Sequence, residues 1–191
     1  MKHLSGLVLA VVFPVLALAQ PVKPGAIIAD FTVNDVKGNP VSFASLKGAI
    51  TVTTFIATGC PVSNDYNERM KALYADYAPK GVKFVFVNSN VTEPPRAVEE
   101  HAGKNGFPFP VYKDPGNVVA DKFGAEFTPD VFVLDSSGTV VYHGHIDDSR
   151  NPANIKKQTL RVALDALVAG KPVPVAETKA FGCTIKRVKK P

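Results

Sequence analysis

The sequence has no internal repeat, no low-complexity linker and no stripe of basic residues interleaved with aromatic ones. Because no linker divides it, a chain of 191 residues is expected to form one well-buried domain. The 22 Lys and Arg residues outnumber the 17 Asp and Glu residues, but part of this excess lies in a short basic tail at the C-terminus. Tails of this kind are usually solvated, so we expect no nucleic-acid partner.

The one long hydrophobic run lies at the N-terminus. Residues 7–18 are almost wholly apolar, but the run is too short for a comfortable membrane span. Ala17-Leu18-Ala19 supplies the small-x-small pattern that a signal peptidase needs, and no cysteine follows it that could carry a lipoprotein anchor. We therefore predict a signal peptide over residues 1–19, no stable membrane insertion after its cleavage, and a periplasmic or secreted protein. An uncleaved anchor is the alternative.

Cysteine is scarce, and the first of the two cysteines stands where a strand is expected to end and a helix to begin. Cys60 follows the β-branched run 51–56, which predicts a buried strand, and precedes Pro61, which suits the first turn of a helix. Apolar residues then recur at helical spacing at Val62, Tyr66, Met70, Leu73 and Tyr77. The other cysteine, Cys183, lies near the C-terminus.

This position is expected to make Cys60 reactive. Unpaired backbone N–H groups and the positive end of the helix dipole face the sulfur, and both favour a thiolate over a thiol. Such a position can lower a cysteine pKa from about 8.5 toward roughly 3.5 to 7.5. The alternative is a half-buried structural thiol, or one half of a structural disulfide.

The remaining pattern predicts an α/β fold with a mixed central sheet and helices on both faces. The expected elements are a hairpin (29–35 with 41–43), strand 51–56, helix 62–77, strand 82–88, helix 92–104, short helix 116–123, a second hairpin (129–134 with 139–146) and helix 152–168. Residues 107–112 contain two prolines, which favours an edge strand or coil. This domain is expected to span residues 20–170, with an irregular tail over 171–191 outside the core.

Several of these stretches resemble the redoxin family, which joins the peroxiredoxins (alkyl hydroperoxide reductase/thiol-specific antioxidant) to periplasmic thioredoxin-like reductases. The similar stretches are Gly25-Ala26-Ile27-Ile28-Ala29-Asp30-Phe31, residues 38–43 and 46–48, and Phe127-Thr128-Pro129 with the strand after it. Cys60-Pro61 falls where the family keeps its reactive cysteine. The resemblance covers residues 24–170 and implies a thioredoxin fold with an N-terminal β-hairpin, and a cis-proline loop at Thr128-Pro129 that pairs with substrate. An ordinary trans proline is the alternative.

The sequence departs from the family at positions that define its reactions. Thioredoxin-type reductases carry a second cysteine three residues after the first, where this chain has Ser63, and copper-delivering relatives carry one at the next position, here Asn64. Peroxiredoxins carry a threonine and a proline where this chain has Ala57 and Thr53. The resemblance therefore implies an exported, peroxiredoxin-like branch with one cysteine at the helix start.

Within this resemblance, thiol–disulfide exchange needs a thiolate and a second thiol that resolves the mixed disulfide. We expect Cys60 to attack a disulfide or peroxide substrate, Cys183 to close an intramolecular disulfide, and an external thiol reductant to reopen it. Ser63 is expected to donate a hydroxyl hydrogen bond to the Cys60 thiolate, and Pro61, Thr128 and Pro129 to shape the substrate cleft. No cofactor is expected.

Three alternatives stay open. A Cys60–Cys183 bond that never opens would be a structural staple, worth roughly 4 to 5 kcal/mol in the chain-entropy model. The second alternative is a peroxiredoxin-like thiol peroxidase. The third is a non-catalytic binding or metal-handling domain, because His143 and His145 share one strand face, although a packed or solvated pair is the more common outcome. Glu93 and Glu126 are expected near Cys60, as possible proton carriers.

Overall fold

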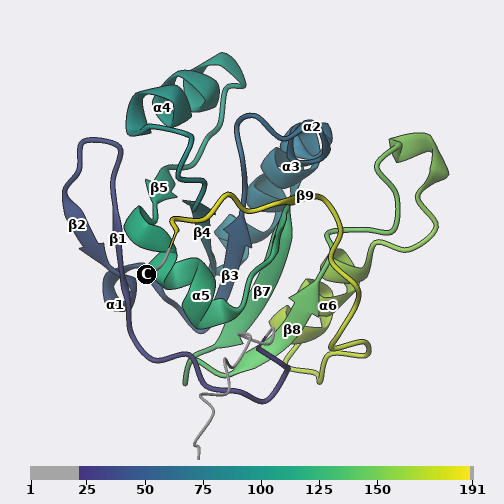
Figure 1. The fold of residues 1–191 in the computed structure, drawn as a ribbon. Helices are drawn as coiled ribbons and strands as arrows, with labels where there is room; N and C mark the ends of the chain where they lie inside the picture. The colour runs from purple at the N-terminus through teal and green to yellow at the C-terminus, as the bar shows by residue number, and fades with distance from the viewer. Residues whose placement is uncertain (1–21, 190–191) are drawn as a thin grey trace, which may run out of the picture.

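The computed structural model describes residues 22–189, so the predicted signal peptide lies outside the described residues. One seven-stranded mixed sheet forms the centre, in the order β2-β1-β5-β4-β3-β7-β8, and β6 and β9 form a separate pair (Figure 1). The strands are β1 (Thr32–Asn34), β2 (Pro40–Ser42), β3 (Ile50–Phe55), β4 (Val82–Asn88), β5 (Val111–Lys113), β6 (Phe127–Thr128), β7 (Asp130–Asp135), β8 (Val140–Gly144) and β9 (Cys183–Thr184). The helices are α1 (Phe43–Leu46), α2 (Pro61–Asp65), α3 (Asn67–Tyr77), α4 (Pro95–Lys104), α5 (Val118–Phe123) and α6 (Thr159–Val168), with 3₁₀ turns at Ala78–Lys80, Pro115–Asn117 and Pro152–Asn154.

The predicted mixed sheet, with helices on both faces, is confirmed. The strand pairs β3–β4 and β4–β5 are parallel, whereas β3–β7, β7–β8 and the N-terminal hairpin β1–β2 are antiparallel. Side chains alternate across the central strands, so each face has its own apolar cluster. Helices α3, α4 and α6 cover one face, and α1 and α5 cover the other. The described residues contain no helix long and apolar enough to cross a membrane.

Three predicted elements differ from the structure. Residues 107–112 were expected at an edge or in coil, but β5 starts after the last proline and lies between β1 and β4. The predicted helix 62–77 is divided at Tyr66 into α2 and α3. The predicted helix 152–168 begins only at Thr159, because the Asp148 carboxylate accepts hydrogen bonds from the N–H groups of Lys156 and Lys157 and holds that stretch in a loop.

The C-terminal tail is mostly irregular, as predicted, but it does not lie outside the core. Its residues Cys183 and Thr184 form β9, which pairs antiparallel with β6. Ile185 is only 6% exposed and belongs to the apolar cluster around α5. The Lys186 N–H donates to Asn90 Oδ1, and Val188 N–H donates to Asn117 Oδ1. From Cys183 to Val188 the tail is therefore packed against the domain rather than loosely attached.

We expect Phe123→Ala to lower the free energy of unfolding by about 3 to 5 kcal/mol, because it removes a fully buried ring from the core. The Phe123 ring meets those of Phe31, Phe55 and Phe132 edge-on, at centroid distances of 5.5, 5.6 and 5.0 Å. Urea unfolding measures the change. The control is Val118→Ala on the same helix, which is 60% exposed and should change stability by less than about 0.5 kcal/mol. Equal effects of the two substitutions would contradict the assigned core.

Candidate active site

Cys60 lies at the predicted junction of strand and helix. After β3 ends at Phe55, a short loop leads to Cys60, which is the N-cap of α2 with extended backbone (φ −92°, ψ 114°). Pro61 occupies the first turn, where its missing N–H costs nothing. The Ser63 N–H donates to Cys60 Sγ over 3.3 Å, so one of the unpaired N–H groups of the helix start is aimed at the sulfur.

Cys60 and Cys183 form a disulfide across 123 residues of sequence, with their Cα atoms 5.9 Å apart. The two sulfur-bearing side chains differ in access to solvent. Cys60 is only 3% exposed, whereas Cys183 is partly exposed on β9. In this disulfide-bonded form Cys60 is therefore covered, whereas part of Cys183 reaches solvent.

The Thr128–Pro129 peptide bond is cis, as the resemblance implied. Its loop lies against both cysteines. The Thr128 carbonyl oxygen is 3.3 Å from Cys60 Sγ, and Thr128 pairs with Cys183 in the β6–β9 ladder. The tail passes so close that a Cβ atom on Gly182 would stand 2.1 Å from the Thr128 oxygen. Cys60, Cys183, Thr128 and Pro129 are therefore brought together.

Ser63 lies beside the sulfur, and its hydroxyl accepts a hydrogen bond that was not predicted. The buried Ser63 Oγ accepts a hydrogen bond from the Ala57 N–H over 3.2 Å, and it is the Ser63 backbone that bonds Cys60. The hydroxyl thus holds the loop between β3 and α2, because it satisfies a buried backbone donor of that loop. Pro61 is exposed at the helix start.

Glu93 is an anchor of this loop. Its two carboxylate oxygens accept hydrogen bonds from the N–H groups of Thr58 and Gly59, each over 2.9 Å. The side-chain amides of Asn88 and Asn90 donate to the same carboxylate. Burial raises the pKa of Glu93, but these four donors lower it more, so its pKa lies below its ordinary value of 4.5. A carboxylate with its oxygens occupied in this way holds backbone in place, rather than carrying protons to Cys60.

The polar groups around Glu93 form a cluster that also contacts the C-terminal tail. The Lys113 ammonium donates to Asn88 Oδ1, to Asn90 O over 3.0 Å and to Glu93 O over 2.7 Å. Burial lowers the pKa of Lys113. Asn90 in turn accepts from the Lys186 N–H over 2.7 Å. One polar cluster therefore fixes the loop before Cys60 and the segment after Cys183. The sequence predicted Glu93 near Cys60, but it carries no signal for the rest of this cluster, because Asn88, Asn90 and Lys113 are polar residues that follow no periodic pattern.

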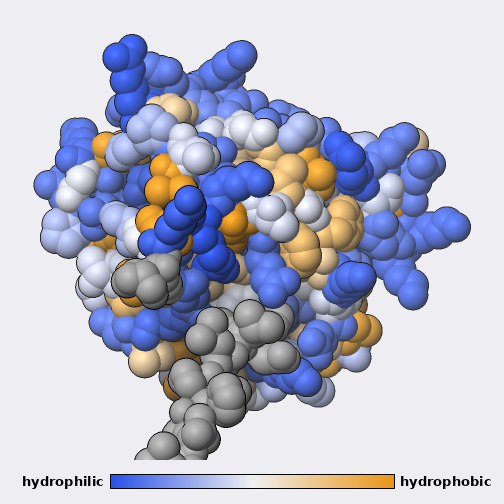
Figure 2. All heavy atoms as spheres, in the orientation of Figure 1, coloured by the Kyte–Doolittle hydropathy of each residue, from blue (hydrophilic) through white to orange (hydrophobic). Residues whose placement is uncertain are grey.

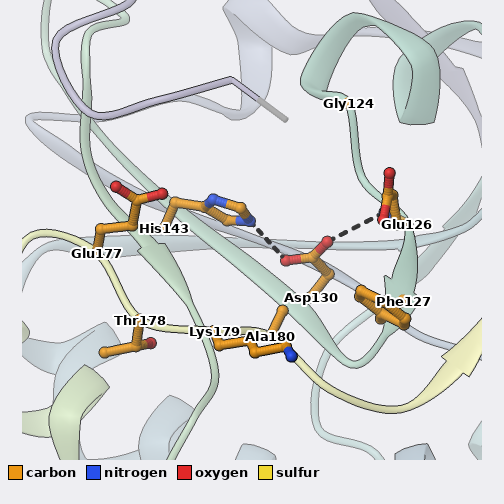
Figure 3. A pocket seen from close by; sticks show the side chains of 9 residues that line it. All are labelled: Gly124, Glu126, Phe127, Asp130, His143, Glu177, Thr178, Lys179 and Ala180. Atoms are coloured by element: carbon orange, nitrogen blue, oxygen red, sulfur yellow. Dashed lines mark hydrogen bonds and ion pairs between the residues drawn. The ribbon is translucent and has the colours of Figure 1, made fainter. Parts of the chain in front are cut away.

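A cavity of about 470 Å³ lies beyond the cis-proline loop (Figure 3). At its base the Asp130 carboxylate accepts from the Glu126 N–H over 3.2 Å and pairs with His143 Nε2 over 2.9 Å. The His143 ring also stacks on Phe132. His145 turns to other partners, Thr159 Oγ1 and the Lys179 carbonyl. The two histidines therefore do not converge on one ligand, and within residues 22–189 no group of three or more His, Cys, Asp and Glu side chains is arranged to hold a metal ion.

Comparisons with known proteins identify the family and support the fold. Residues 24–143 match the AhpC/TSA family. The structure is similar to that of an uncharacterized conserved protein from Geobacillus kaustophilus, with a TM-score of 0.81 and 36% identity over 88% of this chain and 94% of that one. It is also similar to a hypothetical protein from Sinorhizobium meliloti 1021, with a TM-score of 0.80 and 33% identity over 90% of this chain and 98% of the other.

Among curated proteins, the thiol-disulfide oxidoreductase ResA of Halalkalibacterium halodurans is 28% identical over 119 residues. The match covers 62% of this chain and 66% of ResA, so it spans just under two thirds of the length of that relative. The cis-proline loop and all of the central sheet except Gly144 lie within the matched family region, whereas Cys183 lies far beyond its last residue.

We expect the free energy of unfolding of Glu93→Gln to change less with pH in the acid range than that of wild type. A carboxylate with a lowered folded pKa contributes stability that is present above its unfolded pKa and is lost as the pH falls through the folded value. The difference in unfolding free energy between wild type and Glu93→Gln should therefore be largest near pH 7 and shrink as the pH falls below the ordinary value of 4.5. Urea unfolding at stepped pH measures it.

The matched control is Glu99→Gln on α4. Glu99 is exposed, and its removal should change stability by less than about 0.5 kcal/mol at any pH in the series. If the free energies of unfolding of wild type and Glu93→Gln differ by the same amount from pH 7 into the acid range, Glu93 is not the anionic anchor described above.

Proposed function

We propose that this chain, which belongs to the AhpC/TSA family and has a thioredoxin-like fold, is an exported thiol-dependent oxidoreductase that works through Cys60 and Cys183. The observation that carries the proposal is the disulfide between these two residues, set at the start of α2 and against the cis Thr128–Pro129 loop. A disulfide there joins the position of the reactive cysteine to the one other thiol in the sequence.

The reaction follows from thiol–disulfide exchange. The Cys60 thiolate attacks one sulfur of a substrate disulfide, the substrate S–S bond breaks, and the released thiolate takes up a proton from solvent. The Cys183 thiolate then attacks Cys60 Sγ, which closes the Cys60–Cys183 bond and releases the second substrate sulfur. Two electrons pass from the chain to the substrate, and an external thiol reductant supplies them again.

The surroundings of the sulfurs support these roles. The Ser63 N–H stabilises negative charge on Cys60, which makes Cys60 the better leaving group when the disulfide is reduced. Because Cys60 is covered in the oxidised form, the reductant attacks Cys183. Pro61, Thr128 and Pro129 border the sulfurs and shape the approach of substrate. The name of the ResA relative, a thiol-disulfide oxidoreductase, favours this reaction class.

Export fits the same proposal. A disulfide persists in an oxidising compartment such as the periplasm, and the predicted signal peptide would deliver the chain there.

A thiol peroxidase is the second candidate, because the chain belongs to the AhpC/TSA family and the sequence resemblance joins that family to the peroxiredoxins. Against it, Ala57 and Thr53 occupy the positions at which peroxiredoxins carry their peroxide-activating threonine and proline. The two candidates share Cys60 and differ in the substrate it attacks.

The proposal predicts that dithiothreitol opens the Cys60–Cys183 bond without denaturant, and that the reduced chain catalyses reduction of a disulfide such as that of insulin. The rate of disulfide reduction by Cys60→Ser should fall to the background rate, because the substitution removes the attacking sulfur. Cys183→Ser should still form one mixed disulfide per chain with glutathione disulfide, seen by mass spectrometry, but should lose turnover. Ser137→Ala, in an exposed turn, is the control and should keep wild-type activity.

Three results separate the alternatives. Reduction of the bond only in denaturant would show a structural staple. Full activity of Cys60→Ser would remove both enzymatic candidates. A fast, saturable reaction of the reduced chain with hydrogen peroxide, with little exchange toward disulfides, would select the peroxidase.

A further inference from the structure

The tail that carries Cys183 is bound as an added β-strand. Cys183 pairs with Thr128 and Thr184 with Phe127, and the Ile185 N–H donates to the Glu126 carbonyl over 2.9 Å. On the other side of the tail, the Val91 N–H donates to the Lys186 carbonyl over 2.9 Å. Most of these contacts use backbone atoms, which any extended segment could reproduce. Figure 1 shows the tail running from β9 toward α5 across this face.

The side chains of the tail meet selective sites. At Gly182 a Cβ atom would stand 2.1 Å from the Thr128 carbonyl oxygen, and the φ of 157° also favours glycine. Thr184 faces solvent, whereas the Ile185 side chain is buried in the cluster around α5. Arg187 pairs with Asp121 and with the Ala125 carbonyl. We call the surface under the tail, from Thr128 on β6 to Asp121 on α5, the groove. It accepts glycine before the cysteine, an aliphatic residue two positions after it and a basic residue four positions after it.

The surface around the groove fits a protein segment. Figure 2 shows hydrophobic patches on this face beside the path of the tail, interrupted by hydrophilic side chains. Exposed apolar residues beside the C-terminal part of the tail include Val91, which is 53% exposed, and Val118, which is 60% exposed.

The resemblance already implies that substrate pairs with the cis-proline loop. We propose that the segment bound there is an extended, cysteine-containing stretch of another protein with the pattern Gly-Cys-x-aliphatic-x-basic, and that the tail fills the groove as an internal mimic when the disulfide is closed. The inference rests on the proposed function. The Cys60–Cys183 bond then has the geometry of the mixed disulfide between Cys60 and a substrate cysteine.

This arrangement sets the order of events. While the disulfide is closed, the tail is held in the groove at a high effective concentration and excludes other strands. Once the reductant has opened it, the tail keeps only its non-covalent contacts, and a substrate strand competes for the same edge. Cys60 then attacks the substrate disulfide, forming the Cys60–substrate bond and releasing the other substrate sulfur as a thiol. Attack by Cys183 on Cys60 Sγ expels the reduced strand, and the tail takes its place. Substrate therefore enters the reduced chain, and electrons flow from the chain to it.

The test uses the full chain as Cys183→Ser, in which Cys60 is the one thiol left. Three peptides based on residues 180–187 are compared, each with its cysteine joined to 2-nitro-5-thiobenzoate, whose release is followed by absorbance. One has the native sequence, one the Gly182→Ala change and one the Ile185→Ser change. We expect the native peptide to react with Cys60 at least about tenfold faster than either variant peptide.

A second variant tests the competition. In a chain with both Cys183→Ser and Ile185→Ser the tail is held less firmly, so the native peptide should react faster than with Cys183→Ser alone. Circular dichroism confirms that both chains are folded. Glutathione disulfide, which lacks a strand, should react with the two chains at similar rates.

The outcomes distinguish the inference from the function on which it rests. Equal rates for the three peptides, with normal reaction toward glutathione disulfide, would overturn the groove as a selective substrate site and leave the oxidoreductase intact. If Cys60 reacts with neither glutathione disulfide nor any peptide, the proposed function fails, and the substrate site fails with it.

Discussion

The covalent bond between Cys60 and Cys183 is the constraint on which the rest of this site depends. It joins the start of α2 to a tail 123 residues later in the sequence. Because the tail is tied there, β6 gains a partner strand, Ile185 enters the apolar cluster around α5, and Cys60 is covered. The sulfur proposed to react and the segment that covers it are thus one structural unit, and opening the bond changes both at once.

Polar contacts position the two ends of this unit. Glu93 holds the N–H groups of the loop before Cys60, while Asn90 holds the tail after Cys183, and the buried Lys113 ammonium bonds to both residues. In a half-buried setting such bonds are strong only when every member is satisfied, so the cluster acts as a rigid frame. The cavity at Asp130 and His143 adjoins the cis-proline loop, since Asp130 directly follows Pro129.

The regular elements could be predicted where the apolar pattern is long. The strands at residues 50–55 and 82–88 and the hairpin at 130–144 are confirmed. The predictions failed where a local contact overrides the pattern. The Asp148 carboxylate keeps residues 155–158 out of the last helix. The strand β5 is only three residues long and follows two prolines, so the sequence pattern predicted an edge strand or coil where the structure has a strand inside the sheet.

By itself the sequence determined that Cys60 stands between a buried strand and a helix, because β-branched residues, Pro61 and the helical spacing of apolar residues act locally. It also indicated a cis-proline loop at Thr128-Pro129 through resemblance. Only the tertiary structure decided that Cys60 is buried, that Glu93 anchors its loop, and that the tail fills the groove beside β6. These features depend on contacts between residues distant in the chain, and a two-residue strand such as β9 carries no periodicity from which to predict them.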